Sequence, residues 1–195
     1  MVIVDKYSRM VLLGGDLMSL YVTRHGQTDY NVENLVCGTS PAVLTKLGIQ
    51  QAKELGKRLE NIDYKYLYVS PLKRALDTAS LANIKEIEMV IEPRIQEINF
   101  GIYEGLPRDT QGFLTNKYDL AYRYPTGESF IELCNRVYSF LDEIKRQAIE
   151  NDVLLVCHGA VCRAINTYFN DMTNDEIFEY TTENCQLLKY DYLSK

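Results

Sequence analysis

The sequence predicts an α/β fold with three layers, in which helices cover both faces of a mostly parallel sheet. Short apolar runs that suit buried strands alternate along the chain with segments of helical period. Two of those runs end in a histidine followed by glycine, at His25 and His158. Because ligands of such sheets bind at the carboxyl ends of the strands, we expect one functional site at that edge.

The expected strands are residues 20–22, 66–69, 88–92, 152–156 and 186–193. The expected helices are residues 45–61, a segment that Ser70 and Pro71 start and that runs to about 82, residues 129–150 and 160–169, and one that begins at 173. Thr45 suits an N-cap, and Ser129 with Glu132 suits a capping box. Residues 28–44 lack periodicity and are expected to form a loop.

Residues 101–127 form the irregular part of the sequence. Four tyrosines alternate there with three basic residues, Arg108, Lys117 and Arg123. The tyrosines are Tyr103, Tyr118, Tyr122 and Tyr124. This composition suits a lid that faces the substrate, and it equally suits a patch that binds a partner.

Residues 18–195 are expected to form a single domain, preceded by an N-terminal extension at residues 1–17. The extension shows no clean period. Gly14-Gly15-Asp16 could be the translation of a ribosome-binding site, which would make Met18 the native start. An additional edge strand through residues 2–4 is the alternative.

Composition excludes several classes of function. The 195 residues, 46% apolar and 25% charged, suit one soluble domain, and the net charge of -6 argues against a nucleic-acid partner. No apolar run approaches the roughly 18 residues of a membrane span. The five cysteines show no C-x-x-C spacing and suit small core residues. With no signal peptide expected, the sequence predicts a reduced, cytoplasmic setting.

The residues around the two histidines suit phosphoryl chemistry. Glycine after each histidine leaves the backbone open to a ligand and permits a positive φ at the strand tip. Arg24 and Arg74 can each bind phosphate in a bidentate manner. His25 can accept the phosphoryl group, and Glu97 can protonate the leaving alkoxide if a dry pocket and the phosphate charge raise its pKa.

A metal-dependent mechanism is the weaker alternative. The two histidines lie far apart in the sequence, and no third ligand stands at a metal-binding spacing. We therefore expect catalysis without a metal and without another cofactor.

Residues 23–31, Thr-Arg-His-Gly-Gln-Thr-Asp-Tyr-Asn, resemble the signature of the histidine phosphatase superfamily, phosphoglycerate-mutase-like branch. Residues 44–52, 70–79, 96–105 and 158–163 resemble further motifs of that family, in the same order. The resemblance implies His25 as the phosphohistidine and Glu97 as the acid/base. The implied phosphate pocket consists of Arg24, Asn31, Arg74 and His158. Cys37 and Gly38 match a substrate-contacting pair in the mutases.

Within that branch, residues 100–105 and 124–129 resemble the small phosphatases such as α-ribazole phosphatase. The longer insertion typical of the mutases is missing. We therefore expect a metal-independent phosphomonoesterase that acts on a small phosphorylated metabolite. A cofactor-dependent phosphoglycerate mutase and a non-catalytic protein that binds a phosphorylated ligand are the two alternatives. The sequence specifies neither the substrate nor the oligomeric state.

Overall fold

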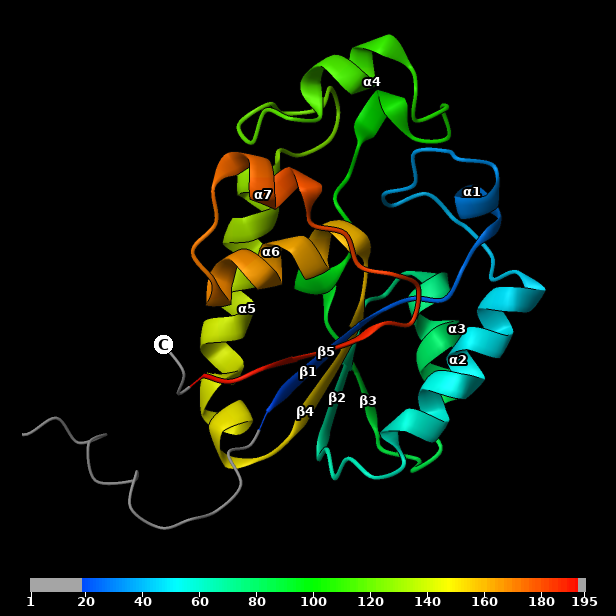
Figure 1. Cartoon of the computed structure of the whole chain (residues 1–195), viewed down its shortest axis with the longest axis vertical. Coiled ribbons are helices and arrows are strands. Elements are labelled where there is room, and N and C mark those ends of the chain that lie inside the picture. Colours follow the sequence, from blue (N-terminus) through cyan, green and yellow to red (C-terminus); the bar gives the residue numbers. More distant parts are fainter. Residues whose placement is uncertain (1–18, 193–195) are drawn as a thin grey trace, which may run out of the picture.

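The computed structural model describes residues 19–192, and Figure 1 shows their arrangement. The strands are β1 (Leu20–Arg24), β2 (Tyr66–Val69), β3 (Met89–Ile91), β4 (Val153–Cys157) and β5 (Leu187–Tyr190). They form one sheet in the order β3-β2-β4-β1-β5. All neighbouring pairs are parallel except β1 with β5. The predicted mostly parallel sheet is confirmed, whereas the predicted extension at residues 1–17 lies outside the described residues.

Helices cover both faces of this sheet, as Figure 1 shows. The α-helices are α1 (Asp29–Val32), α2 (Lys46–Leu59), α3 (Lys73–Ala82), α4 (Gln111–Asn116), α5 (Phe130–Glu150), α6 (Gly159–Phe169) and α7 (Asn174–Glu179). Two 3-10 turns are η1 (Pro93–Ile95) and η2 (Gly101–Tyr103). The helices α2 and α3 lie on one face, and α5 and α6 lie on the other. The predicted three-layer α/β/α architecture is therefore confirmed.

The central strand β4 explains why two helical layers are needed. Leu154 and Val156 belong to the apolar core under α2 and α3, whereas Val153 and Leu155 belong to the core under α5 and α6. All five residues of β4 are buried. A strand that is apolar on both faces is stable only when both faces are covered.

The helix starts follow the predicted capping chemistry. Thr45 Oγ1 accepts a hydrogen bond from the amide of Gly48 at the start of α2 (3.0 Å). Ser129 and Glu132 form the predicted capping box at the start of α5. These side chains satisfy backbone donors that the first turn of a helix leaves unpaired.

Residues 28–44 contain one element that the sequence analysis did not predict. The short helix α1 is capped by Thr28, which forms a capping box with Asn31. Thr28 also forms an isolated bridge with Leu44. One helical turn is too short to produce a hydrophobic period, so only its cap could have indicated it.

The predicted lid, residues 101–127, holds η2 and α4 and lies at the top of Figure 1. Its tyrosines are less available to a ligand than expected. Tyr124 packs edge to face with Tyr103 and with Tyr122, and Phe100 and Phe113 join the same cluster. Tyr124 is buried. This cluster stabilises the lid, so most of its aromatic surface serves packing.

The five cysteines form no disulfide, and four of them are buried. Burial raises the pKa of Cys37 to about 11 and that of Cys185 to about 12, so these thiols stay protonated at neutral pH. The interpretation of the cysteines as small core residues is confirmed. Within residues 19–192, no helix is both long and apolar enough to cross a membrane.

Candidate active site

Sheet register places the two histidines side by side. Arg24 at the end of β1 pairs with Cys157 at the end of β4, so the next residue of each strand is a histidine. The ring centroids of His25 and His158 are 5.1 Å apart. Both side chains are buried, with 4% and 0% of their surface exposed. The predicted meeting of two strand tips is therefore present in the fold.

The backbone next to His25 selects one tautomer of its side chain. Nδ1 lies 2.7 Å from the carbonyl oxygen of Gly26, and because a carbonyl only accepts, Nδ1 carries the proton. Nε2 is then the unprotonated nitrogen with a lone pair. Arg74 Nε donates to it over 3.2 Å.

The two glycines after the histidines serve packing and access, and neither adopts the positive φ that glycine permits. Among the described glycines, positive φ occurs at Gly101 and Gly105. Gly26 packs directly on α2, since a Cβ there would lie 2.5 Å from the carbonyl oxygen of Gly48. Gly159 begins α6, where φ is helical, and its Cβ position lies 3.7 Å from Arg24 Nε and 3.8 Å from Glu97 Oε2.

Arg74 is the most constrained cation of the site. It stands in the first turn of α3, as predicted, and is 1% exposed. Its Nη2 donates to the carbonyl oxygen of Gly38 (2.6 Å) and its Nη1 to that of Ser40 (3.1 Å). These two bonds fix the guanidinium plane, so that Nε points at His25.

Arg24 and His158 each present a buried polar atom without a hydrogen-bond partner in the described chain. For Arg24 this atom is Nε, while its Nη1 donates to the carbonyl oxygen of Thr182 (2.7 Å). For His158 it is Nδ1, while its Nε2 lies 2.7 Å from Ser70 Oγ. Buried polar atoms are usually paired. Two such atoms at the sheet edge that carries His25 are what a site for an anionic ligand provides.

Glu97 lies at the amino end of α6, close to Arg24. Its Oε2 accepts from the amide of Ala160 (3.1 Å) and its Oε1 from that of Ile98 (3.0 Å), and the side chain is 7% exposed. Glu97 therefore lies at the same sheet edge as His25 and His158, as predicted.

The remaining predicted residues are Asn31 in α1 and Cys37 and Gly38 in the loop between α1 and α2. Asn31 uses its Oδ1 to accept from the amide of Thr28 (3.0 Å), which leaves its side-chain nitrogen as the donor for a ligand. Gly38 accepts from Arg74, as described above, and Cys37 Sγ lies 3.9 Å from the carbonyl oxygen of Ser40. Cys37 and Gly38 are thus connected to the site through the backbone that holds Arg74.

Burial and neighbouring arginines keep both histidines neutral. Burial lowers the pKa of His25 well below 6.5, and Arg74 and Arg24 lower it further. Burial likewise lowers the pKa of His158, with Arg74, His25 and Arg24 adding to the effect. A neutral imidazole carries a free lone pair without prior deprotonation, while Arg74 and Arg24 supply positive charge beside it.

These lowered pKa values predict a loss of stability in mild acid. Below pH 6.5 the unfolded histidines bind protons that the folded ones do not, so the free energy of unfolding should fall. The fall should reach at most about 1.4 kcal/mol per pH unit for each histidine. Urea unfolding between pH 7.5 and 5.5 measures it. His158→Gln should lose one histidine's share of the slope, and an unchanged slope would contradict the prediction.

Several residues that position the site were not predicted from the sequence. Asn184 Nδ2 donates to the carbonyl oxygen of His25 (2.8 Å), and Thr78 Oγ1 accepts from the amide of Gly26 (3.0 Å). Arg136 donates to the carbonyl oxygen of Glu97 (3.2 Å) and pairs with Glu128 (2.6 Å). Ser70, which contacts His158, is the one supporting residue that the sequence could have indicated, because it follows a strand as His25 and His158 do.

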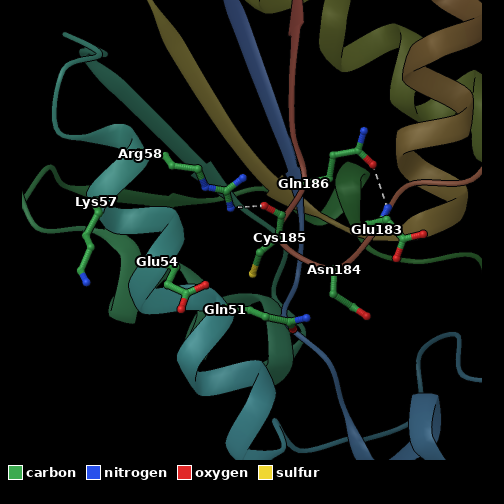
Figure 2. Close-up of a pocket in the computed structure, with 8 residues that line it drawn as sticks. All are labelled: Gln51, Glu54, Lys57, Arg58, Glu183, Asn184, Cys185 and Gln186. Atoms are coloured by element: carbon green, nitrogen blue, oxygen red, sulfur yellow. Dashed lines mark hydrogen bonds between the residues drawn. The ribbon is translucent and has the colours of Figure 1, made fainter.

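An open groove of about 730 Å³ lies between α2 and the segment before β5, as Figure 2 shows. Its lining residues are Gln51, Glu54, Lys57, Arg58, Glu183, Asn184, Cys185 and Gln186. None of them is a predicted site residue. Arg58 is occupied by the carbonyl oxygen of Cys185 (2.6 Å). Gln51 and Asn184 hydrogen-bond to the backbone of residues 25–27, so the lining of this groove supports the segment that carries His25.

Several known proteins are similar to this chain in sequence or in structure. The chain is 29% identical to a protein named "Probable phosphoglycerate mutase GpmB" from Yersinia pestis (strain Pestoides F) over 185 residues, 90% of this chain and 86% of that protein. The α-ribazole phosphatase structure from Shigella flexneri has a TM-score of 0.79 and 26% identity, covering 89% of this chain and 90% of that one. Bacillus stearothermophilus YhfR has a TM-score of 0.77 and 30% identity, covering 86% and 87%.

A family model matches nearly the whole described chain. It spans residues 20–195 and describes branch 1 of the histidine phosphatase superfamily. The match includes both strand-tip histidines, Arg74 and Glu97, whose arrangement was described above. The chain therefore belongs to the histidine phosphatase superfamily, branch 1.

Proposed function

We propose that this protein hydrolyses a small phosphomonoester through a phosphohistidine on His25, without a metal. The observation that carries the proposal is the tautomer of His25, whose unprotonated Nε2 lies against Arg74. Unpartnered buried atoms of Arg24 and His158 lie on the same sheet edge. A nucleophile that faces this many donors suits a phosphoryl group with its charged oxygens.

The first step would form a bond between His25 Nε2 and phosphorus and break the bond between phosphorus and the ester oxygen. Arg24, Arg74 and His158 would bind the phosphoryl oxygens. Glu97 would transfer its proton to the departing alkoxide. Arg74 Nε, which donates to Nε2 in this structure, would then donate to a phosphoryl oxygen.

The second step would release inorganic phosphate. Glu97, now deprotonated, would take a proton from water as the water oxygen attacks phosphorus. The bond between His25 Nε2 and phosphorus would break, which returns the electron pair to the imidazole. The arginines would again stabilise the transferring phosphoryl group, so the protein needs to supply positioning and charge only.

A cofactor-dependent phosphoglycerate mutase remains the second candidate, because the Yersinia relative carries that name. A mutase must bind a second phosphate and exclude water from its phosphohistidine. Of the three basic lid residues, Arg123 pairs with Glu132 (3.3 Å) and Lys117 lies over the ring of Tyr118. Burial lowers the pKa of Arg108, and Glu97 opposes this, so Arg108 is near the site. One lid cation at the site favours hydrolysis over a mutase reaction.

The function is tested with purified protein and a panel of phosphorylated metabolites, which include α-ribazole phosphate and 3-phosphoglycerate. We expect inorganic phosphate to be released without a bisphosphoglycerate primer, to be unaffected by EDTA and to be inhibited by vanadate. Interconversion of 3- and 2-phosphoglycerate that depends on primer and exceeds phosphate release would favour the mutase. Phosphate binding without turnover of any member would favour a non-catalytic binding protein.

A further inference from the structure

Glu104 makes an unusual set of contacts next to the site. Its carboxylate accepts four hydrogen bonds from backbone amides. The donors are Gly38 (3.0 Å), Thr39 (3.0 Å), Ser40 (3.1 Å) and Phe100 (3.0 Å). A carboxylate offers about four lone-pair positions, so these amides use its capacity as an acceptor. Glu104 is therefore fully engaged with the backbone.

The loop that Glu104 holds is the loop that holds Arg74. The amides of residues 38–40 point to Glu104, and the carbonyl oxygens of Gly38 and Ser40 accept from the Arg74 guanidinium. The loop is thus fixed from both sides. The loop packs closely at Gly38, since a Cβ there would collide with Glu104 Oε1 and with the carbonyl oxygen of Ile98.

The fourth bond of Glu104 reaches the segment that carries Glu97. Phe100 stands three residues after Glu97, and its amide donates to Glu104 Oε1. Glu104 itself lies in the lid, directly after η2, where its amide donates to the carbonyl oxygen of Gly101 (3.1 Å). One carboxylate therefore connects the lid, the Arg74 loop and the acid/base segment.

Resting on the proposed function, we propose that Glu104 is a positioning residue, which orients Arg74 toward His25 through the loop of residues 38–40. It acts on the phosphoryl group through Arg74 and touches no leaving group. This role differs from that of a proton donor, which a second glutamate near Glu97 would otherwise suggest. The difference predicts a distinct kinetic result.

Glu104→Gln is the direct test, because the amide keeps the shape and places an NH₂ donor against two backbone donors. We expect kcat/KM to fall about 10- to 100-fold, the range for a displaced catalytic group. The fall should be equal for an alkyl phosphate and for nitrophenyl phosphate, and vanadate should inhibit less well by a similar factor. Glu104→Asp retains the charge, so its kcat/KM should lie between that of the wild type and that of Glu104→Gln.

Two controls separate positioning from general damage. Glu132→Gln makes the same change in a carboxylate that accepts the backbone amide of Ser129 (2.8 Å) remote from Arg74, and it should keep kcat/KM within about twofold. In an Arg74→Gln background, Glu104→Gln should add little further loss, because both changes remove the same interaction. Circular dichroism and thermal unfolding report the folded fraction, and Glu104→Asp supplies the test if Glu104→Gln does not fold.

Three results would overturn the proposal: an unchanged rate in Glu104→Gln, a loss greater for the alkyl ester than for nitrophenyl phosphate, or losses that add fully to those of Arg74→Gln. The second would make Glu104 a proton donor. Failure of the proposed function is distinguishable, because the wild-type protein would then release no phosphate from either substrate.

Discussion

Replacing His25 with alanine is expected to lower kcat for every phosphomonoester by about 10³-fold or more, since no covalent intermediate can then form. The loss should not depend on the leaving group. Arg24 and Arg74 remain in place, so inorganic phosphate should still bind and raise the melting temperature. Steady-state rates with nitrophenyl phosphate and an alkyl phosphate, together with thermal unfolding in phosphate, measure both parts.

The matched control for this variant is Ser70→Ala, which removes only the hydroxyl that contacts His158 Nε2. It should retain the phosphoenzyme and lose much less activity than His25→Ala. If His25→Ala kept more than about a tenth of the wild-type kcat, His25 would not be the nucleophile, because removing a nucleophile costs far more.

Glu97→Gln is expected to produce the second large effect, and this effect should depend on the substrate. An alkyl alkoxide needs a proton to leave, so its rate should fall by roughly 10² to 10⁴, as for a lost general acid. Nitrophenolate leaves without a proton, so the transfer of the phosphoryl group from nitrophenyl phosphate to the enzyme should change little in rate. The two substrates are thus the internal control of one variant.

Equal losses of kcat/KM for both substrates would contradict the acid role of Glu97, because kcat/KM covers only the steps up to the phosphoenzyme and excludes its later hydrolysis. They would instead indicate that the carboxylate supports the amino end of α6, through its bond from Ala160. The comparison with Glu104→Gln is informative, because that variant is expected to show equal losses. Two glutamates near one site would then be assigned opposite kinetic patterns.

Much of this site was predictable because parallel strands meet at a common edge. The apolar runs before His25 and His158 predicted strands, and adjacent strands in register bring the next residues together. A helix-start signal, Ser70 followed by Pro71, placed Arg74 in the first turn of α3. Periodicity and capping depend on residues close together in the sequence, so they predict helices and strands without knowledge of distant contacts.

The supporting contacts could not be predicted, because they join residues distant in sequence through the backbone. Asn184 contacts the carbonyl oxygen of His25, and Thr182 contacts Arg24, from a segment without regular period. The role of Glu104 could not be predicted, since its four backbone donors depend on how residues 38–40 fold. The close packing of Gly26 on Gly48 is likewise a contact between separate segments.

The phosphoenzyme itself tests the central claim most directly. Wild-type protein mixed with labelled substrate and quenched within one turnover should carry label that survives alkali and is released by acid, as a bond between phosphorus and histidine nitrogen requires. Mass spectrometry after alkaline quenching should locate the phosphoryl group on His25, and His25→Ala should carry none. Label that is lost in alkali, that lies on another residue or that persists in His25→Ala would contradict the mechanism.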